Sequence, residues 1–91
     1  MKVRVTRRAV NQIEAALDYV FQNSPRGAAG ISARIDAVLD LLAEHPNVGQ
    51  ETSRPGVRRV VLTPYPYAVF YRTMGSEVVI LRFRHGARKP I

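Results

Sequence analysis

The chain has 91 residues, of which 46% are hydrophobic and 23% charged, a composition typical of a globular domain rather than a disordered segment. It contains no cysteine, which excludes disulfide frameworks, cysteine-ligated zinc sites and thiol catalysis. No apolar run approaches membrane-spanning length, and the first residues lack the apolar stretch of a signal peptide. We therefore expect residues 1–91 to form one cytoplasmic domain with no membrane association.

The first half of the chain predicts a short strand followed by two helices. Residues 2–6 alternate in polarity and contain two valines, which favours a strand, and Thr6 can cap a helix that starts at Arg7. Ser24 is a suitable N-cap for a second helix with Pro25 in its first position, and Pro46 disfavours helical geometry at the residue before it. The apolar residues recur at helical spacing in both segments: Val10, Ile13, Leu17, Val20 and Phe21, then Ile31, Ile35, Val38, Leu39 and Leu42. Two amphipathic helices joined so tightly predict an antiparallel hairpin that ends at residue 45.

The second half predicts three strands. Residues 46–56 have the composition of a loop, and strands are expected over 57–63, 67–73 and 77–84. Their connections are too short for parallel crossovers, so these strands should form an antiparallel meander. The predicted fold is α+β, with the order β-α-α-β-β-β and the helical hairpin packed on a small antiparallel sheet.

Alternation along the last two strands predicts which residues share a face of the sheet. In the middle strand Tyr67, Val69 and Tyr71 alternate with Ala68, Phe70 and Arg72. In the last strand Val79, Leu81 and Phe83 alternate with Val78, Ile80, Arg82 and Arg84. One face is then apolar enough to receive the hairpin, whereas the other becomes basic towards the end of the last strand.

The net charge of +7 is unevenly distributed along the chain. Residues 1–53 hold six basic and six acidic groups, whereas residues 54–91 hold eight basic groups and Glu77 as the single acidic one. This asymmetry favours a face that meets an anionic partner, although a merely solvated basic surface is the alternative. Twelve of the fourteen cations are arginines, whose planar fork binds carboxylates and phosphates in pairs of hydrogen bonds.

Few catalytic arrangements are compatible with the sequence. There is no metal-ligand spacing, no Gly-x-Ser-x-Gly motif and no glycine-rich phosphate loop, so no metal and no cofactor is expected. Cleavage of RNA by its own 2′-hydroxyl needs only an acid, a base and cations around the phosphate. His85 could be the acid or base, although a lone histidine at a strand end is more often a surface residue. The cations available to it are Arg59, Arg82, Arg84 and Arg88.

A helix-turn-helix function is disfavoured by the charge of the helices. Residues 7–45 hold four cations and five anions, whereas a helix that enters the major groove of DNA should be basic on its exposed face. We therefore expect no direct sequence-specific DNA binding.

Several stretches, taken together, resemble the RelE/ParE superfamily of toxins from type II toxin–antitoxin systems, over nearly the full chain. They are Val5-Thr6-Arg7-Arg8-Ala9, Glu44-His45-Pro46, Gly56-Val57-Arg58-Arg59, Pro64-Tyr65-Pro66-Tyr67-Ala68-Val69-Phe70-Tyr71, Val79-Ile80-Leu81 and His85-Gly86-Ala87-Arg88-Lys89-Pro90. The resemblance implies the helical hairpin on an antiparallel sheet that the periodicity predicts.

The resemblance also implies one of two activities. RelE-like members cut messenger RNA on the ribosome and typically have an arginine in the strand motif at the position of Ala68, and a tyrosine or further acid–base group where this chain has Gly86-Ala87. An alanine cannot stabilise a pentacovalent phosphate. The ParE branch, which lacks the nuclease residues and poisons DNA gyrase, is therefore the closer resemblance, and a ribosome-dependent endoribonuclease is the alternative. A member that still binds its antitoxin but poisons nothing is a third possibility.

Both branches imply a cognate antitoxin, here ParD-like, which forms a hetero-oligomer with the toxin through apolar anchors and acidic side chains. For a gyrase poison the expected target-binding residues are Arg82, Arg84, His85, Arg88 and Lys89. The expected antitoxin-binding residues are Arg58, Arg72, Arg82, Arg84 and Arg88. Only for a ribonuclease would the catalytic residues be Arg59, Arg82, His85 and Arg88.

Overall fold

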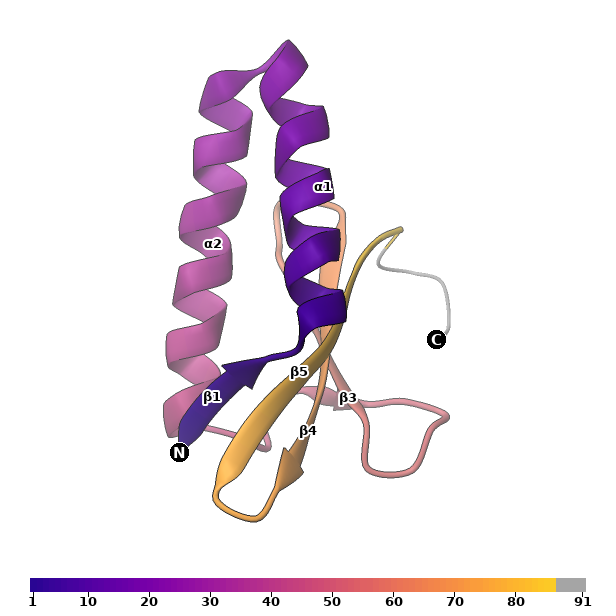
Figure 1. Ribbon diagram of the computed structural model, residues 1–91. Helices are drawn as coiled ribbons and strands as arrows, with labels where there is room; N and C mark the ends of the chain where they lie inside the picture. The colour runs from indigo at the N-terminus through magenta and orange to yellow at the C-terminus, as the bar shows by residue number, and fades with distance from the viewer. Residues whose placement is uncertain (87–91) are drawn as a thin grey trace.

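A computed structural model of the chain describes residues 1–86, in which a helical hairpin packs on a five-stranded sheet (Figure 1). The two helices lie side by side, and the tip of the hairpin lies at the opposite end of the molecule from the β4–β5 turn. The elements in chain order are β1 (Lys2–Val5), α1 (Arg7–Asn23), α2 (Pro25–Glu44), β2 (Gln50–Glu51), β3 (Arg58–Val61), β4 (Tyr67–Met74) and β5 (Glu77–His85). The predicted order of elements is confirmed, and the loop over 46–56 contains the short β2 in addition.

The sheet is mixed, with the strand order β1-β5-β4-β3-β2. The predicted meander is present, because β3, β4 and β5 pair antiparallel. The expectation of a wholly antiparallel sheet was incomplete: β1 pairs parallel to β5, with Val3 beside Val78 and Val5 beside Ile80. The reason is topological. A parallel pair needs a long crossover between its two strands, and the elements between β1 and β5 supply it. The helical hairpin returns the chain to the end of the sheet where β1 begins.

Both helix N-termini have the predicted caps. The Thr6 hydroxyl oxygen accepts from the Ala9 N–H at 3.2 Å, and the Ser24 hydroxyl oxygen accepts from the Gly27 N–H at 2.9 Å. Pro25 occupies the first turn of α2, and that helix ends at His45 as predicted. Side-chain caps satisfy N–H groups that have no partner within the helix.

The main core lies between the hairpin and one face of the sheet, which we call the hairpin face. Its buried side chains come from both helices and from the strands, and include Ala9, Ile31, Ile35, Val38, Leu42, Leu62, Tyr67, Val69, Tyr71, Val78, Ile80 and Phe83. The opposite face, called the outer face, has a small apolar cluster of Val57, Ala68 and Phe70 with Leu81 packed against it. No helix contributes to this second cluster, so within residues 1–86 the apolar centre of the outer face is formed by strands and a loop.

The alternation predicted for the last strand is interrupted by a β-bulge. Tyr71 pairs with Ile80, but the preceding Phe70 pairs with Arg82, so Leu81 is an extra residue in β5. Val78 and Ile80 therefore lie on the hairpin face together with Phe83, and the prediction that they share a face with Arg82 and Arg84 was wrong. A bulge inserts one unpaired residue and shifts the following side chains to the other face.

The loop after α2 is fixed to the sheet by Tyr71, which is fully buried. Its hydroxyl donates to the Pro46 carbonyl at 2.8 Å and accepts from the Gly49 N–H at 2.8 Å. Arg58 Nη1 donates to the Gly49 carbonyl at 2.8 Å. Burial raises the pKa of the Tyr71 phenol, against smaller opposing effects of the Gly49 hydrogen bond and the Arg58 charge. In residues 1–86, neither helix combines the length and apolar character needed to cross a bilayer.

Candidate functional site

The outer face of the sheet carries most of the basic side chains of the strands. Directly paired residues share a face, so the pairs of Arg59 with Phe70, of Arg82 with Phe70 and of Arg84 with Ala68 place these arginines on the outer face. The same register adds Arg72 beside Val79, and Lys2 and Arg4 on β1. Among the strands of the described chain, Glu77 is the one carboxylate in this register, and Arg4 Nε lies 3.4 Å from it. The outer face is therefore strongly electropositive.

The start of α1 brings another arginine to this face. The Thr6 hydroxyl donates to the Ile80 carbonyl at 2.8 Å, and the Thr6 N–H donates to the same carbonyl at 3.1 Å. These bonds fix the first turn of α1 against β5 just before the bulge. Arg8 lies in that turn, which has no acidic residue. The positive charge of Arg8 lowers the pKa of Arg82 on the neighbouring β5.

The loop between β2 and β3 adds a further arginine. The Thr52 hydroxyl donates to the Val57 carbonyl at 2.9 Å and accepts from the Arg54 N–H at 3.2 Å. The Val57 N–H donates to the Arg54 carbonyl at 3.1 Å, and the Val57 side chain is buried in the outer apolar cluster. These contacts hold Arg54 at the edge of the outer face, where its charge also acts on Arg82.

Arg82 is the centre of this group, because repulsion from its neighbours lowers its pKa. The nearby charge of Arg8 is the largest cause, followed by partial burial and the charges of Arg54 and Arg84. We call these four residues (Arg8, Arg54, Arg82 and Arg84) the arginine cluster. Beside the cluster, Nε of Arg72 is buried and has no hydrogen-bond partner among residues 1–86.

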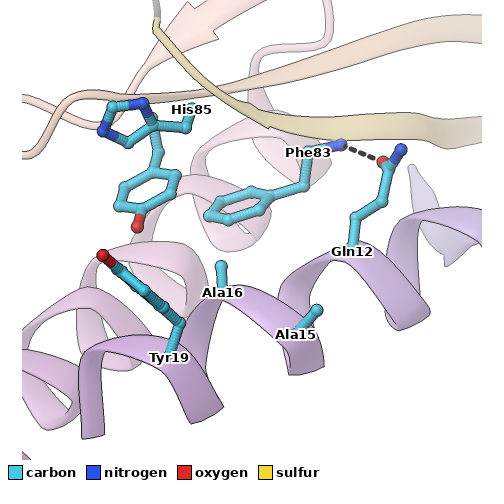
Figure 2. A pocket seen from close by; sticks show the side chains of 7 residues that line it. Gln12, Ala15, Ala16, Tyr19, Phe83 and His85 are labelled. Atoms are coloured by element: carbon cyan, nitrogen blue, oxygen red, sulfur yellow. Dashed lines mark hydrogen bonds between the residues drawn. The ribbon is translucent and has the colours of Figure 1, made fainter. Parts of the chain in front are cut away.

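A second feature is an apolar groove of about 540 Å³ between α1, the start of β4 and the end of β5 (Figure 2). Its lining residues are Gln12, Ala15, Ala16, Tyr19, Tyr67, Phe83 and His85. The Tyr67 and Phe83 rings stack at 5.0 Å and 11°, and the His85 ring meets Tyr67 edge-on at 5.1 Å. Gln12 holds the wall in place, since its Oε1 accepts from the Phe83 N–H at 2.8 Å. Tyr19 is 71% exposed at the rim, so the groove offers aromatic and methyl surface to a partner.

His85 and the arginines of β5 lie on opposite faces of the sheet. His85 pairs with Tyr67 and belongs to the groove on the hairpin face, whereas Arg82 and Arg84 point to the outer face. Arg59 is also on the outer face, where its Nη2 donates to Gln50 Oε1 at 2.9 Å. Among the described residues, the histidine and the arginines that a ribonuclease would need are therefore not gathered around one point.

Comparison with known proteins gives the family. The family model of the ParE toxin of the type II toxin–antitoxin system parDE matches residues 3–90. The chain belongs to the ParE toxin family. A relative named Toxin RelE2, from Caulobacter vibrioides, is 36% identical over 83 residues, which cover 91% of this chain and 92% of that protein.

Further relatives agree with this family. Toxin ParE3 from Caulobacter vibrioides is 35% identical over 81 residues, which cover 81% of this chain and 79% of that protein. A chain in the structure of a chromosomal ParDE toxin–antitoxin system from P. aeruginosa is similar, with a TM-score of 0.81, 26% identity, and coverage of 93% of this chain and 95% of that one. The relatives of this ParE-family chain carry both RelE and ParE names, so their names leave the choice of target open.

The residues predicted from the sequence are divided between three places in this ParE-family chain. Arg59, Arg72, Arg82 and Arg84 lie on the outer face, and His85 lies in the groove. Arg58 pairs with Tyr71 and supports the loop after α2. Arg88 and Lys89 lie outside the described residues. Ala68 occupies the position at which the resemblance to RelE-like nucleases would place an arginine. This alanine is fully buried in the outer apolar cluster.

Sequence reasoning missed two members of the cluster and most of the groove. Arg8 could have been found from its place two residues after the Thr6 cap, because a cation in the first turn of a helix is electrostatically unfavourable and its presence there suggests another role. Arg54 gave no such signal, since its position depends on the turn that Thr52 and Val57 close. Gln12 and Tyr19 appear in the sequence only as polar or off-stripe positions of a helix.

Proposed function

We propose that this ParE-family chain is a cytoplasmic toxin that binds DNA gyrase and traps its cleaved-DNA intermediate. In this proposal Arg82 and Arg84 contact the target from the outer face, and Arg88 and Lys89, which lie outside the described residues, are further target-binding residues. The toxin needs no cofactor in this mechanism, because it acts by binding. Growth arrest then follows from the broken DNA that gyrase no longer reseals.

The observation that carries the proposal is the environment of Ala68. This position is fully buried between Val57 and Phe70 on the outer face, so it supplies no cation to a phosphate. Loss of one such electrostatic contact reduces the rate of an enzyme about 10²–10³-fold. Arg84 is the residue paired with Ala68 across the strands, and it lies on the face opposite His85.

The alternative is a ribosome-dependent endoribonuclease with His85 as acid or base. This alternative is less well supported, because Arg59 and Arg82 lie on the other face of the sheet from His85. It would require Arg88 or a group on the ribosome to complete the site.

We further propose that a cognate, ParD-like antitoxin neutralises the toxin as a hetero-oligomer. The groove beside α1 suits the apolar anchors of such a partner, and the outer face suits its acidic side chains, notably at Arg72, Arg82 and Arg84. Arg58 is a weaker candidate, since its guanidinium is already engaged by Gly49. An antitoxin that reached both surfaces would cross the end of β5, where Arg84 and His85 are neighbours.

The experiment that tests the proposal compares two purified systems. The chain is titrated into gyrase with relaxed plasmid, with cleaved DNA trapped by detergent, and in parallel into a translating extract in which messenger RNA cleavage is mapped by primer extension. The proposal expects linear DNA in the first system and intact messenger RNA in the second. Cleaved messenger RNA together with normal supercoiling would contradict the gyrase proposal and support the endoribonuclease alternative.

A further inference from the structure

We infer that the arginine cluster binds the phosphate backbone of duplex DNA directly and without regard to base sequence. This inference rests on the proposed function, because a toxin bound to gyrase lies next to the DNA that gyrase holds. It goes beyond that function, since it adds the DNA that gyrase holds to the contacts made by the outer face. The case for duplex DNA as the ligand has three parts, which concern the charge, the internal partners and the aromatic residues of the outer face.

The first part is the gathering of charge. The cluster takes one arginine from the first turn of α1, one from the loop before β3 and two from β5. Each of these segments is fixed in place by its own contacts: α1 by Thr6, the loop by Thr52 and Val57, and β5 by its pairing with β4. A fold that holds four cations close enough to repel one another gains free energy when an anion binds among them.

The second part is the absence of internal partners. The one carboxylate on the outer face of the described strands is Glu77, which pairs with Arg4 at the start of β5, whereas Arg82 and Arg84 lie near its end. Arg8 adds to the positive end of the α1 dipole instead of opposing it. Arginine forks on a flat surface match phosphate oxygens, and such contacts position a protein on DNA without reading sequence.

The third part is the shortage of aromatic surface, which favours duplex DNA over single-stranded RNA. Proteins that bind single strands stack the bases on exposed aromatic side chains. On the outer face of the described strands the one aromatic residue is Phe70, which is only 3% exposed. The exposed aromatic residues Tyr19 and Phe21 belong to α1 near the hairpin tip, away from the cluster. The outer face can therefore contact a backbone but cannot stack bases.

The test measures binding of the purified chain to a fluorescein-labelled 20-base-pair duplex by anisotropy between 50 and 200 mM KCl. Each phosphate contact contributes about 0.9 to the slope of log K against log salt, so the four arginines predict a slope of about −3 to −4. Arg82→Gln and Arg54→Gln should each reduce the magnitude of the slope by about 1 and weaken binding to every sequence alike. Arg26→Gln, an exposed arginine of α2, is the matched control and should change neither.

Several results would overturn the inference. They are no binding at 50 mM KCl, equal slopes for Arg82→Gln and Arg26→Gln, or tighter binding of a single-stranded RNA of equal charge. Competition by polyglutamate as effective as that by DNA would make the cluster a site for acidic peptides instead. Circular dichroism and thermal melting confirm that each variant is folded.

Failure of this inference is distinguishable from failure of the proposed function. Gyrase poisoning without binding to free DNA would remove the inference alone. Binding to DNA without any effect on gyrase would remove the proposed function and leave the phosphate site.

Discussion

Ile80 and Arg82 are two positions apart on β5 but lie on opposite faces of the sheet. Ile80 is buried beneath the hairpin, whereas Arg82 pairs with Phe70 on the outer face, because Leu81 is the extra residue of a β-bulge. Regular alternation would have placed Arg82 and Arg84 towards the hairpin if Ile80 kept its place. The bulge thus lets β5 contribute apolar residues to the core at both ends and still present its arginines to a partner.

Deletion of Leu81 tests this account of β5. Without it, Ile80 and Arg82 become neighbours and regular alternation keeps Phe83 on the hairpin face. We therefore expect ΔLeu81 to fold, with a loss of about 1–2 kcal/mol in the free energy of unfolding from the removed side chain. Deletion of Phe83 is the control: it removes a core ring and turns Arg84 towards the core, so that variant should not fold. Equal stability of the two deletions in urea titrations would contradict the assignment of the bulge.

Tyr71→Phe should destabilise the protein by about 1–3 kcal/mol. The change leaves the Gly49 N–H and the Pro46 carbonyl without their shared partner, and unsatisfied buried groups cost about that much. Urea denaturation at pH 7 measures the loss. Tyr65→Phe, for which no hydrogen bond of the hydroxyl is seen in residues 1–86, is the control and should have a much smaller effect.

The contribution of Tyr71 should also depend on pH. Its pKa in the folded state is raised above the ordinary value of 10.0, so the folded protein holds the phenolic proton more tightly than the unfolded chain does. The stabilisation is therefore complete below pH 10 and is lost as pH rises through the folded-state pKa. The difference in unfolding free energy between wild type and Tyr71→Phe should shrink above pH 10, and a constant difference would contradict this role.

The two helix caps should differ in strength. Ser24→Ala removes one cap and should cost about 1 kcal/mol. Thr6→Ala removes a cap and also the donation to the Ile80 carbonyl, so it should cost more, about 2 kcal/mol. Thermal melts of both variants compare them directly. A smaller loss for Thr6→Ala than for Ser24→Ala would show that α1 is not fixed to β5 as described.

Filling the groove tests its role in antitoxin binding. Ala15 is exposed on the groove wall, and Ala15→Trp should weaken binding of the cognate antitoxin at least tenfold, because an apolar anchor could no longer enter. Ala33→Trp, on an exposed position of α2, should leave the affinity unchanged. Calorimetric titration of the antitoxin into each variant provides the numbers, and equal affinities would remove the groove from the interface.

The helices were predictable because their signals are local. The Thr6 and Ser24 caps, Pro25 and the apolar stripes act within a few residues, and they have the predicted places except for Phe21, which is 58% exposed. The parallel pairing of β1 was not predictable from local signals, since it depends on where the hairpin returns the chain. The bulge at Leu81 was hidden because Ile80-Leu81-Arg82 shows no glycine or other mark of a bulge.

The candidate site was predictable in its chemistry and less so in its geometry. The excess of arginine after residue 53 indicated the basic face, and four of the predicted arginines lie on it. Pairing across strands then separates His85 and Arg58 from the others, which charge counting along the chain cannot do. Arg8 joins the cluster only because the Thr6 hydroxyl donates to the Ile80 carbonyl and fixes α1 to β5, a contact between residues more than seventy positions apart.

The central claim is that the outer face, and not His85, carries the toxicity. The most direct measurement is gyrase-mediated cleavage of relaxed plasmid by Arg82→Glu and His85→Ala side by side with the wild type. The account predicts that Arg82→Glu loses at least tenfold in the amount of linear DNA formed, whereas His85→Ala stays within about threefold of the wild type. Full activity of Arg82→Glu together with loss of activity in a folded His85→Ala would contradict it.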